Sequence, residues 1–346
     1  MIRPEAPFFL FGMGRREKFF YKNKALFNLK GDTVLDFSKA TEECILPEKY
    51  TVRLTMADGK TVTIREDARG VWYENGERQA LLTEYPIKLP TFDGHPYRAQ
   101  LRILLHEILY NITTDGRPLP NLFVYNKPWY RDSALIAMVL QATDNLDLIR
   151  DFILGMTECY DRNNAGNCEP DNLGEALYLI SCASDRNHPL VDALVTEAKR
   201  LWTENGMPGL IDFNDHPVYS AKWLKYGLDR LGLDHSWVKI PSVADDYSPL
   251  FWMDYKDAHV EIPRRTYDKL YPYLWWAEQH FYETDVPDSY LEITYPMTNE
   301  TQASQADYEG TRLLSETYAD AKNSSPHTWH AAEMFLYLME KTERRN

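Results

Sequence analysis

The sequence predicts a mainly α-helical protein, an (α/α)6 toroid that follows a small β-rich domain. Short alternations of apolar and polar residues, separated by turns, fill the first part of the chain. After residue 91, helices that are apolar on nearly every face recur about every 40–55 residues. Such helices must be enclosed by others, which favours a closed ring of inner and outer helices. We therefore expect a β-rich domain over 1–90 and a toroid over 91–346.

The β-rich domain is predicted from hairpin patterns. Val52 and Leu54 alternate with polar residues before a turn at 57–60, and Val62 and Ile64 continue the alternation after it. The same pattern surrounds a turn at residues 74–77, and residues 29–34 are predicted as another turn.

After Pro90 the hydrophobic period changes to that of a helix. Leucines three and four residues apart predict an amphipathic helix over 98–112, and residues 146–156 and 189–202 are predicted as amphipathic outer helices. The inner helices are expected where nearly every face is apolar. They are residues 134–140, 176–183, 217–232, 270–277 and 331–339, with a weaker candidate at 247–255.

Charge and composition exclude several classes of partner. The 346 residues carry a net charge of −14, so we expect neither nucleic acid nor an anionic membrane surface as partner. No apolar stretch approaches the ~20 residues of a membrane span. The apolar run at 7–11 precedes its charges, unlike a secretory signal. The 4 cysteines form no CxxC pair, which favours reduced thiols and a cytoplasmic protein, while the oligomeric state is left open.

Aromatic and acidic residues gather just before the predicted inner helices. In a toroid the N-termini of these helices open into one funnel, so we expect the clusters to form one site. Sugar rings stack on aromatic side chains, and their hydroxyls bind carboxylates and Arg, so the expected partner is an oligosaccharide or glycoside. The residues expected to bind it are Tyr125, Trp129, Arg131, Asp132, Asp171, Asn172, Glu175, Tyr318, His327 and Trp329.

These residues also have structural interpretations. Asp132 and Asp171 stand where helix N-caps are common. The tryptophans of the clusters are equally compatible with a hydrophobic core. His327 and His330 have no carboxylate at metal-ligand spacing, so we expect neither a metal nor another cofactor.

Several segments resemble the glucoamylase-type inverting glycoside hydrolases, which are six-hairpin toroids. Residues 129–135 are similar to that family's Trp-x-Arg-Asp segment, and residues 313–318 to the segment that carries its catalytic base. Further similarities follow the same order along the chain. They lie at residues 218–230, 271–279 and 327–332. The resemblance implies that Glu316 is the base and that Arg131 and Asp132 hold the sugar.

The family's catalytic acid is a Glu in a Gly-x-Trp-Glu segment. The corresponding segment here ends in Asp212 and lacks the Trp, and Asp215 is a second candidate for the acid. We expect an inverting hydrolase of a glucoside-like oligosaccharide, with Asp212 as acid and Glu316 as base about 6.5–9.5 Å apart. By their position, Arg264 or Arg265 would add positive charge to the site.

Two other functions stay open. A polysaccharide lyase or a sugar epimerase requires a Tyr or His base and a group that neutralises a carboxylate, roles that His327, His330, Tyr125 and Asn172 fit. A non-catalytic carbohydrate-binding scaffold would explain why Asp stands at 212 in place of Glu. Product absorbance from an unsaturated sugar distinguishes the lyase, and binding without turnover distinguishes the scaffold.

Overall fold

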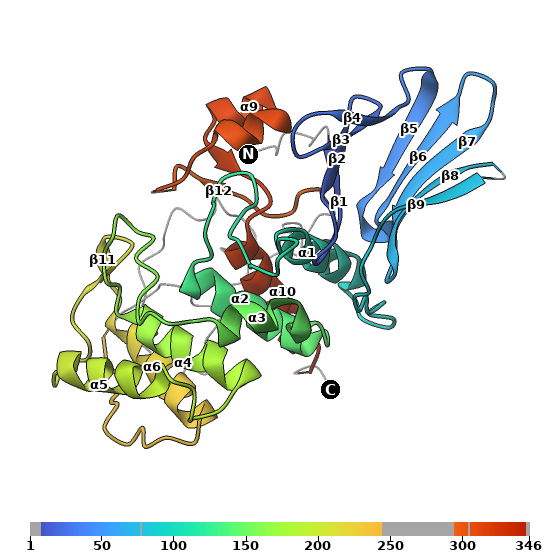
Figure 1. Cartoon of the computed structure of the whole chain (residues 1–346). Coiled ribbons are helices and arrows are strands. Elements are labelled where there is room, and N and C mark those ends of the chain that lie inside the picture. Colours follow the sequence, from blue (N-terminus) through green and yellow to red (C-terminus); the bar gives the residue numbers. More distant parts are fainter. Residues whose placement is uncertain (1–7, 77, 244–293, 304, 344–346) are drawn as a thin grey trace.

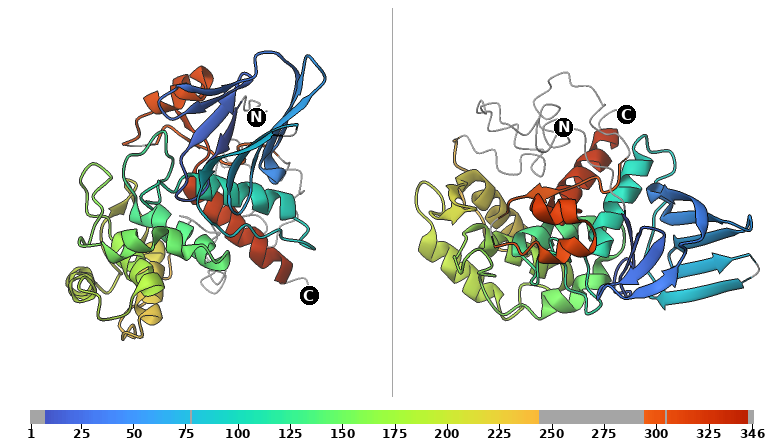
Figure 2. Two further views of the ribbon diagram at one scale, coloured as in Figure 1. Left: turned by 45° about the vertical axis from the view of Figure 1, so that its right-hand side comes forward. Right: turned by 90° about the horizontal axis from the view of Figure 1, so that it is seen from above.

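The computed structural model describes residues 8–76, 78–243, 294–303 and 305–343, and every statement below concerns these residues. Two antiparallel sheets come first in the chain and helices follow (Figure 1). Figures 1 and 2 show the sheets at one end of the molecule and helices α4 to α6 at the other.

The sheets are meanders in which neighbouring strands are consecutive in sequence. The first contains β1 (Phe8–Phe11), β2 (Phe19–Lys22), β3 (Ala25–Asn28) and β4 (Thr33–Asp36). The second contains β5 (Ala40–Leu46), β6 (Thr51–Met56), β7 (Thr61–Glu66), β8 (Gly70–Asn75) and β9 (Arg78–Glu84). The hairpins predicted around residues 29–34, 57–60 and 74–77 are therefore confirmed.

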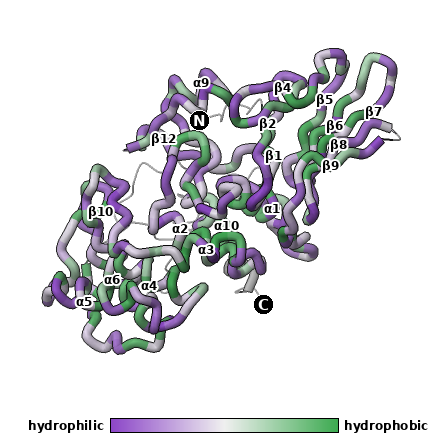
Figure 3. The backbone as a smooth tube through the Cα atoms, viewed as in Figure 1, coloured by the Kyte–Doolittle hydropathy of each residue, from purple (hydrophilic) through white to green (hydrophobic). Residues whose placement is uncertain are grey.

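Alternation of side chains explains why the second sheet packs on one face. Val62 and Ile64 of β7 are buried, whereas the alternating residues Thr61, Thr63 and Arg65 are partly or fully exposed to solvent. Figure 3 shows the corresponding alternation of hydrophobic and hydrophilic residues along these strands. A period of two places every second side chain on the same face of a strand.

Eight α-helices lie in the described residues. They are α1 (Arg98–Tyr110), α2 (Tyr130–Ala142), α3 (Arg150–Leu154), α4 (Asp171–Ala183), α5 (Val191–Leu201), α6 (Pro217–Arg230), α9 (Glu316–Asp320) and α10 (Thr328–Glu343). Two short antiparallel strand pairs lie among the helices. β10 (Leu210–Ile211) and β11 (Asn214–Asp215) form a hairpin, whereas β12 (Glu300–Thr301) pairs with β13 (Asn323–Ser324), which follows α9 in the sequence.

Most of the predicted helices are confirmed at their predicted positions. Residues 146–156 differ, because a 3-10 turn over Leu146–Ile149 precedes the short α3. The predicted helices at 247–255 and 270–277, and also Arg264 and Arg265, lie outside the described residues.

The long helices pack side by side in the order α1, α10, α2, α4, α6. The closest approach is between α4 and α6. A Cβ on Gly174 would lie 2.3 Å from the backbone nitrogen of Leu224, and one on Gly227 would lie 2.6 Å from the carbonyl oxygen of Gly174. Glycine at these two positions lets the backbones touch, which fixes the start of α4 relative to α6.

The first sheet and the helices share one hydrophobic core. Phe9 of β1 stacks on His106 of α1 with 4.9 Å between ring centroids, and Phe8 meets Tyr318 of α9 edge-on at 5.8 Å. The boundary predicted at residue 90 falls between β9 and α1. Aromatic residues of the β-rich part are thus core residues of the helical part as well.

The predicted fold class is wrong. The described residues form a mixed structure of antiparallel sheets and eight α-helices, not a mainly α-helical (α/α)6 toroid. Hydrophobic periodicity is a local signal, so it located individual helices correctly. It carried no information on how many helices close a ring, or on the sheet whose phenylalanines complete the helical core.

Two simpler expectations concern membranes and thiols. None of the described helices has both the length and the apolar character needed to cross a bilayer. Cys44, Cys159, Cys168 and Cys182 are free thiols.

Candidate functional site

A cavity of about 340 Å³ lies where α2 and α10 begin. Its size is at the lower end of the range of about 300–1,000 Å³ that small-molecule sites occupy. We call it the carboxylate pocket. It is lined by Pro120, Tyr125, Trp129, Arg131, Asp132, Asp212, Phe213, Glu300, Gln302, Ala303, His327 and Trp329.

The start of α2 supplies one wall of the carboxylate pocket. Trp129 is the N-cap residue, and no side chain caps the helix. Asp132 lies in the first turn, where its Oδ1 is buried without a hydrogen-bond partner. At α4 no side chain caps the helix either, and Asp171 follows the N-cap residue Pro170. The interpretation of Asp132 and Asp171 as N-caps is therefore wrong.

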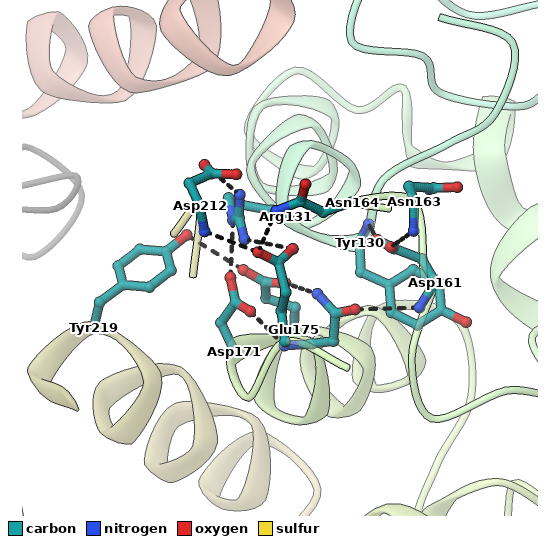
Figure 4. A network of polar contacts seen from close by, with 11 residues as sticks. Tyr130, Arg131, Asp161, Asn163, Asn164, Asp171, Glu175, Asp212 and Tyr219 are labelled. Atoms are coloured by element: carbon teal, nitrogen blue, oxygen red, sulfur yellow. Dashed lines mark hydrogen bonds and ion pairs between the residues drawn. The ribbon is translucent and has the colours of Figure 1, made fainter. Parts of the chain in front are cut away.

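Arg131 is the centre of a buried ionic network (Figure 4). Its Nε donates to Asp171 at 2.8 Å, Nη1 to Asp212 at 2.8 Å and Nη2 to Glu169 at 3.1 Å. The side chains of Arg131, Glu169 and Asp171 are at most 3% exposed, whereas that of Asp212 is 33% exposed at the cavity. A guanidinium presents several donors in a rigid plane, so it fixes the three carboxylates relative to one another.

The hairpin of β10 and β11 brings Asp212 to the pocket. Its two-residue turn is Asp212-Phe213, with positive φ angles of 45° and 73°. Two-residue hairpin turns of this kind favour Asn or Gly, so a phenylalanine there is strained. Phe213 is also 60% exposed and lines the cavity. The turn is held by Glu169, whose Oε1 accepts the backbone N–H of Asp212 at 2.8 Å.

A second polar group joins β12 to the start of α10. His327 lies 2.9 Å from Glu300, and the hydroxyl of Tyr125 donates to the same carboxylate oxygen at 2.8 Å. Burial disfavours the charged forms of both His327 and Glu300, but the attraction between the two groups outweighs this effect. It raises the pKa of His327 and lowers the pKa of Glu300 to about 2. Glu300 is therefore a fixed anion in the pocket.

Asp132 differs from the other carboxylates in its protonation. Burial raises its pKa to about 7, against the opposing effect of His327 and Arg131. The negative charges of Glu300 and Asp212 act in the same direction as burial. Near neutral pH Asp132 therefore retains a proton in part of the molecules, beside the ionised carboxylate of Glu300.

Three predicted ligands lie behind Arg131 instead of at the cavity. Asp171, Asn172 and Glu175 are buried, and Asn172 donates to Glu175 at 3.2 Å. Burial raises the pKa of Asp171 to about 6 and raises that of Glu175 as well. These residues support Arg131, and Tyr219 of α6 also donates to Glu175 at 3.3 Å (Figure 4).

The structure does not bring Glu316 to the carboxylate pocket. Its side chain is 73% exposed on α9 and pairs with Arg312, so it does not face Asp212 across the cavity. Tyr318 is buried against Phe8 and is also absent from the pocket lining. The expected acid and base pair of Asp212 and Glu316 therefore lacks a common cavity, because the local motif did not determine on which face α9 packs.

Other predicted residues are brought together. Tyr125, Trp129, Arg131, Asp132, Asp212, His327 and Trp329 all line the same cavity. Asp215 is exposed in β11, outside the lining. His330 stacks on Trp329 with 5.6 Å between centroids, one layer behind the pocket.

Sequence reasoning missed Glu300, Phe213 and Glu169 as functional candidates. Glu300 lies in a two-residue strand and Phe213 in a turn, where neither helical nor strand periodicity gives a signal. Glu169 stands two residues before Asp171 in a cluster already noted as acidic, which was the available signal. Within the described residues, no group of three or more His, Cys, Asp or Glu is arranged to hold a metal ion.

Comparison with protein-family models, with curated proteins and with solved structures finds no match to this chain. Together with the mixed sheet and helix architecture, this overturns the resemblance to glucoamylase-type hydrolases. The function has to be argued from the site alone.

Proposed function

We propose that the carboxylate pocket hydrolyses a glycosidic bond, with Asp132 as general acid and Asp212 as general base. The observation that carries the proposal is the buried Asp132 carboxyl group in the wall of the cavity, close to a second, more exposed carboxylate. Asp132 is 4% exposed, its Oδ1 has no hydrogen-bond partner, its pKa is raised to about 7, and it lines the same cavity as the carboxylate of Asp212. Acid and base catalysis at a glycosidic bond requires one carboxyl group that donates a proton and a second one that accepts a proton from water.

The proposed reaction balances without another reactant. Asp132 transfers its proton to the glycosidic oxygen as the bond between that oxygen and the anomeric carbon breaks. A water molecule forms the new bond to the anomeric carbon, and its proton passes to Asp212. Proton exchange with solvent then restores both carboxyl groups.

Asp212 suits the base better than Glu300 does. The Asp212 side chain is one-third exposed, so water reaches it from the open side of the cavity. Glu300 is bound by both His327 and Tyr125, and a pKa of about 2 makes it a weak base. We assign Glu300 to binding sugar hydroxyls.

The lining also suits one sugar ring. Trp129, Trp329 and Tyr125 present aromatic surface, and the Arg131 guanidinium carbon lies 5.9 Å from the Trp329 ring centroid. Aromatic rings bind the C–H faces of sugars, while fixed carboxylates accept hydrogen bonds from hydroxyls. Because several carboxyl groups line so small a cavity, we expect it to bind a neutral sugar ring and not an acidic one.

Release of reducing ends from a panel of neutral and acidic oligosaccharides tests the proposal. We expect turnover by the wild type that Asp132→Asn abolishes. The inverting course stays a prediction, and NMR of the first anomer released checks it. An unsaturated product would show that the reaction is an elimination and not a hydrolysis. Binding of sugars without any turnover would favour the non-catalytic scaffold.

A further inference from the structure

A second cavity adjoins the carboxylate pocket. It has a volume of about 450 Å³ and shares Tyr125 and Trp129 with the first cavity as a common wall. We call it the cation pocket. It is lined by Leu122, Phe123, Val124, Tyr125, Asn126, Lys127, Trp129, Arg162, Asn163, Gln305, Asp307 and Gly310.

The charges of the cation pocket are reversed relative to its neighbour. Lys127 and Arg162 line it against one carboxylate, Asp307, which leaves one net positive charge in a chain of net charge −14. Neither cation forms an ion pair within the part of the chain that the structure describes. Asp307 instead accepts the backbone N–H of Glu309 at 3.1 Å.

The backbone holds Arg162 at this place. Asn163 donates to the carbonyl of Pro128 at 2.6 Å. Asp161 accepts the backbone N–H of Tyr130 at 2.7 Å (Figure 4). These bonds tie the loop of Arg162 to the chain that carries Lys127 and Trp129. Arg162 itself has a φ of 55°, a conformation that costs energy for a residue other than glycine and that the two bonds maintain.

We infer that the cation pocket binds an acidic sugar residue next to the neutral residue held in the carboxylate pocket. Lys127 and Arg162 would pair with its carboxylate or sulfate, and the amides of Asn126 and Gln305 would bind its hydroxyls. Because Tyr125 and Trp129 line both cavities, an oligosaccharide can extend from one cavity into the other along these two rings. This inference rests on the proposed function, because that function places the neutral sugar in the carboxylate pocket and so the acidic sugar next to it.

Direct binding separates the charge site from catalysis. The probes are glucose, glucuronate and glucose 6-sulfate, titrated into the full chain by calorimetry or NMR at low and high salt. We expect glucuronate or the sulfate ester to bind at least about fivefold more tightly than glucose, with the preference lost at high salt. The better of the two anions identifies the acidic group. Equal binding of all three sugars would overturn the inference.

Matched variants locate the site. Lys127→Gln combined with Arg162→Asn removes both cations, and Asn tolerates the positive φ at 162. The control is Lys88→Gln with Arg98→Gln, two exposed cations outside both cavities. We expect the first pair to abolish the preference for the anion and leave the affinity for glucose unchanged, and the control pair to change neither.

Turnover shows which proposal fails if one does. Trisaccharides of glucose are compared with counterparts oxidised to the carboxylate at C6 of one residue. We expect the Lys127 and Arg162 variant to raise KM for the oxidised substrate alone. Turnover with no effect of that variant would overturn the cation pocket only. Anion binding that depends on the two cations, without turnover of any substrate, would keep the cation pocket and overturn the hydrolase.

Discussion

The carboxylate pocket and the cation pocket share one aromatic wall but treat their charges in opposite ways. In the carboxylate pocket Arg131, Asp132 and Glu300 are largely or wholly buried, and Arg131 and Glu300 are held by ionic or hydrogen-bonded partners. In the cation pocket Lys127 and Arg162 are exposed. Burial changes the protonation of a group, whereas exposed charges act on a ligand through an attraction that salt screens.

The difference separates chemistry from recognition. A buried acid with a raised pKa is suited to transfer a proton, so changes in the carboxylate pocket should act on kcat. Exposed cations contribute modest binding energy, so changes in the cation pocket should act on KM. The predictions below test this division from the largest expected effect to the smallest.

Replacement of the acid should give the largest loss of activity. We expect Asp132→Asn to lower kcat for oligosaccharides by about 10²–10⁴-fold with little change in KM, because the size of the side chain is kept and only the proton is lost. Initial rates under saturating substrate measure it. The matched control is Glu316→Gln, an exposed carboxylate outside the pocket whose loss should change neither constant. A loss in the control equal to that in Asp132→Asn would contradict the assignment.

Removal of Arg131 should give the largest loss of stability. Arg131→Met leaves Glu169 and Asp171 buried without their cation, which should lower the free energy of unfolding by about 3–5 kcal/mol. Chemical denaturation measures it, and Arg200→Met, which breaks an exposed ion pair with Glu197, is the control with a loss below about 1 kcal/mol.

The stability of this variant should also depend on pH in a defined direction. Burial already raises the pKa of Asp171 to about 6, above its value of about 3.9 in the unfolded chain. A raised pKa in the folded state means that stability is greatest below the unfolded pKa and is lost as pH rises. Arg131→Met should therefore recover stability in acid, and a defect independent of pH would contradict the role of these carboxylates.

The activity should fall as the pH rises through about 7. Asp132 acts in its protonated form, and burial sets its pKa to about 7, so kcat/KM should fall about tenfold per pH unit on the basic side. Measurement of kcat/KM between about pH 5 and 9 determines this fall on the basic side of the profile. A basic limb that persists unchanged in the residual activity of Asp132→Asn would assign that ionisation to another group.

The strained turn should give the smallest effect. Phe213→Gly removes a side chain from a positive φ, which costs about 1–2 kcal/mol, but adds backbone entropy to the unfolded chain of about 0.5–1 kcal/mol. We expect a gain in stability below about 1 kcal/mol together with a higher KM. Phe213→Ala is the control, since it removes the ring and keeps the strain; equal stability of both variants would contradict the strain.

The sequence predicted the local structure well. The hairpins around residues 29–34, 57–60 and 74–77 and helices α1, α2, α4, α5, α6 and α10 follow from periodicity and turn residues alone. Trp129, Arg131, Asp132, Asp212 and His327 were singled out because they precede apolar helices, and the structure brings them to one cavity.

The rest depended on packing between distant segments. Asp132 and Glu316 both stand at or near a helix start, yet one is buried with a raised pKa and the other is exposed beside Arg312. No local pattern distinguishes them. Glu300 reaches the pocket only because β12 pairs with β13 next to His327, a contact that composition and periodicity do not encode.

The most direct test of the account varies the leaving group of the substrate. A 2,4-dinitrophenolate departs without a proton, whereas the oxygen of a sugar or an alkyl alcohol requires one. We predict that Asp132→Asn keeps most of its activity toward a 2,4-dinitrophenyl glycoside and loses about 10²–10⁴-fold toward an alkyl glycoside of the same sugar. Equal losses on both substrates would contradict the role of Asp132 as the acid.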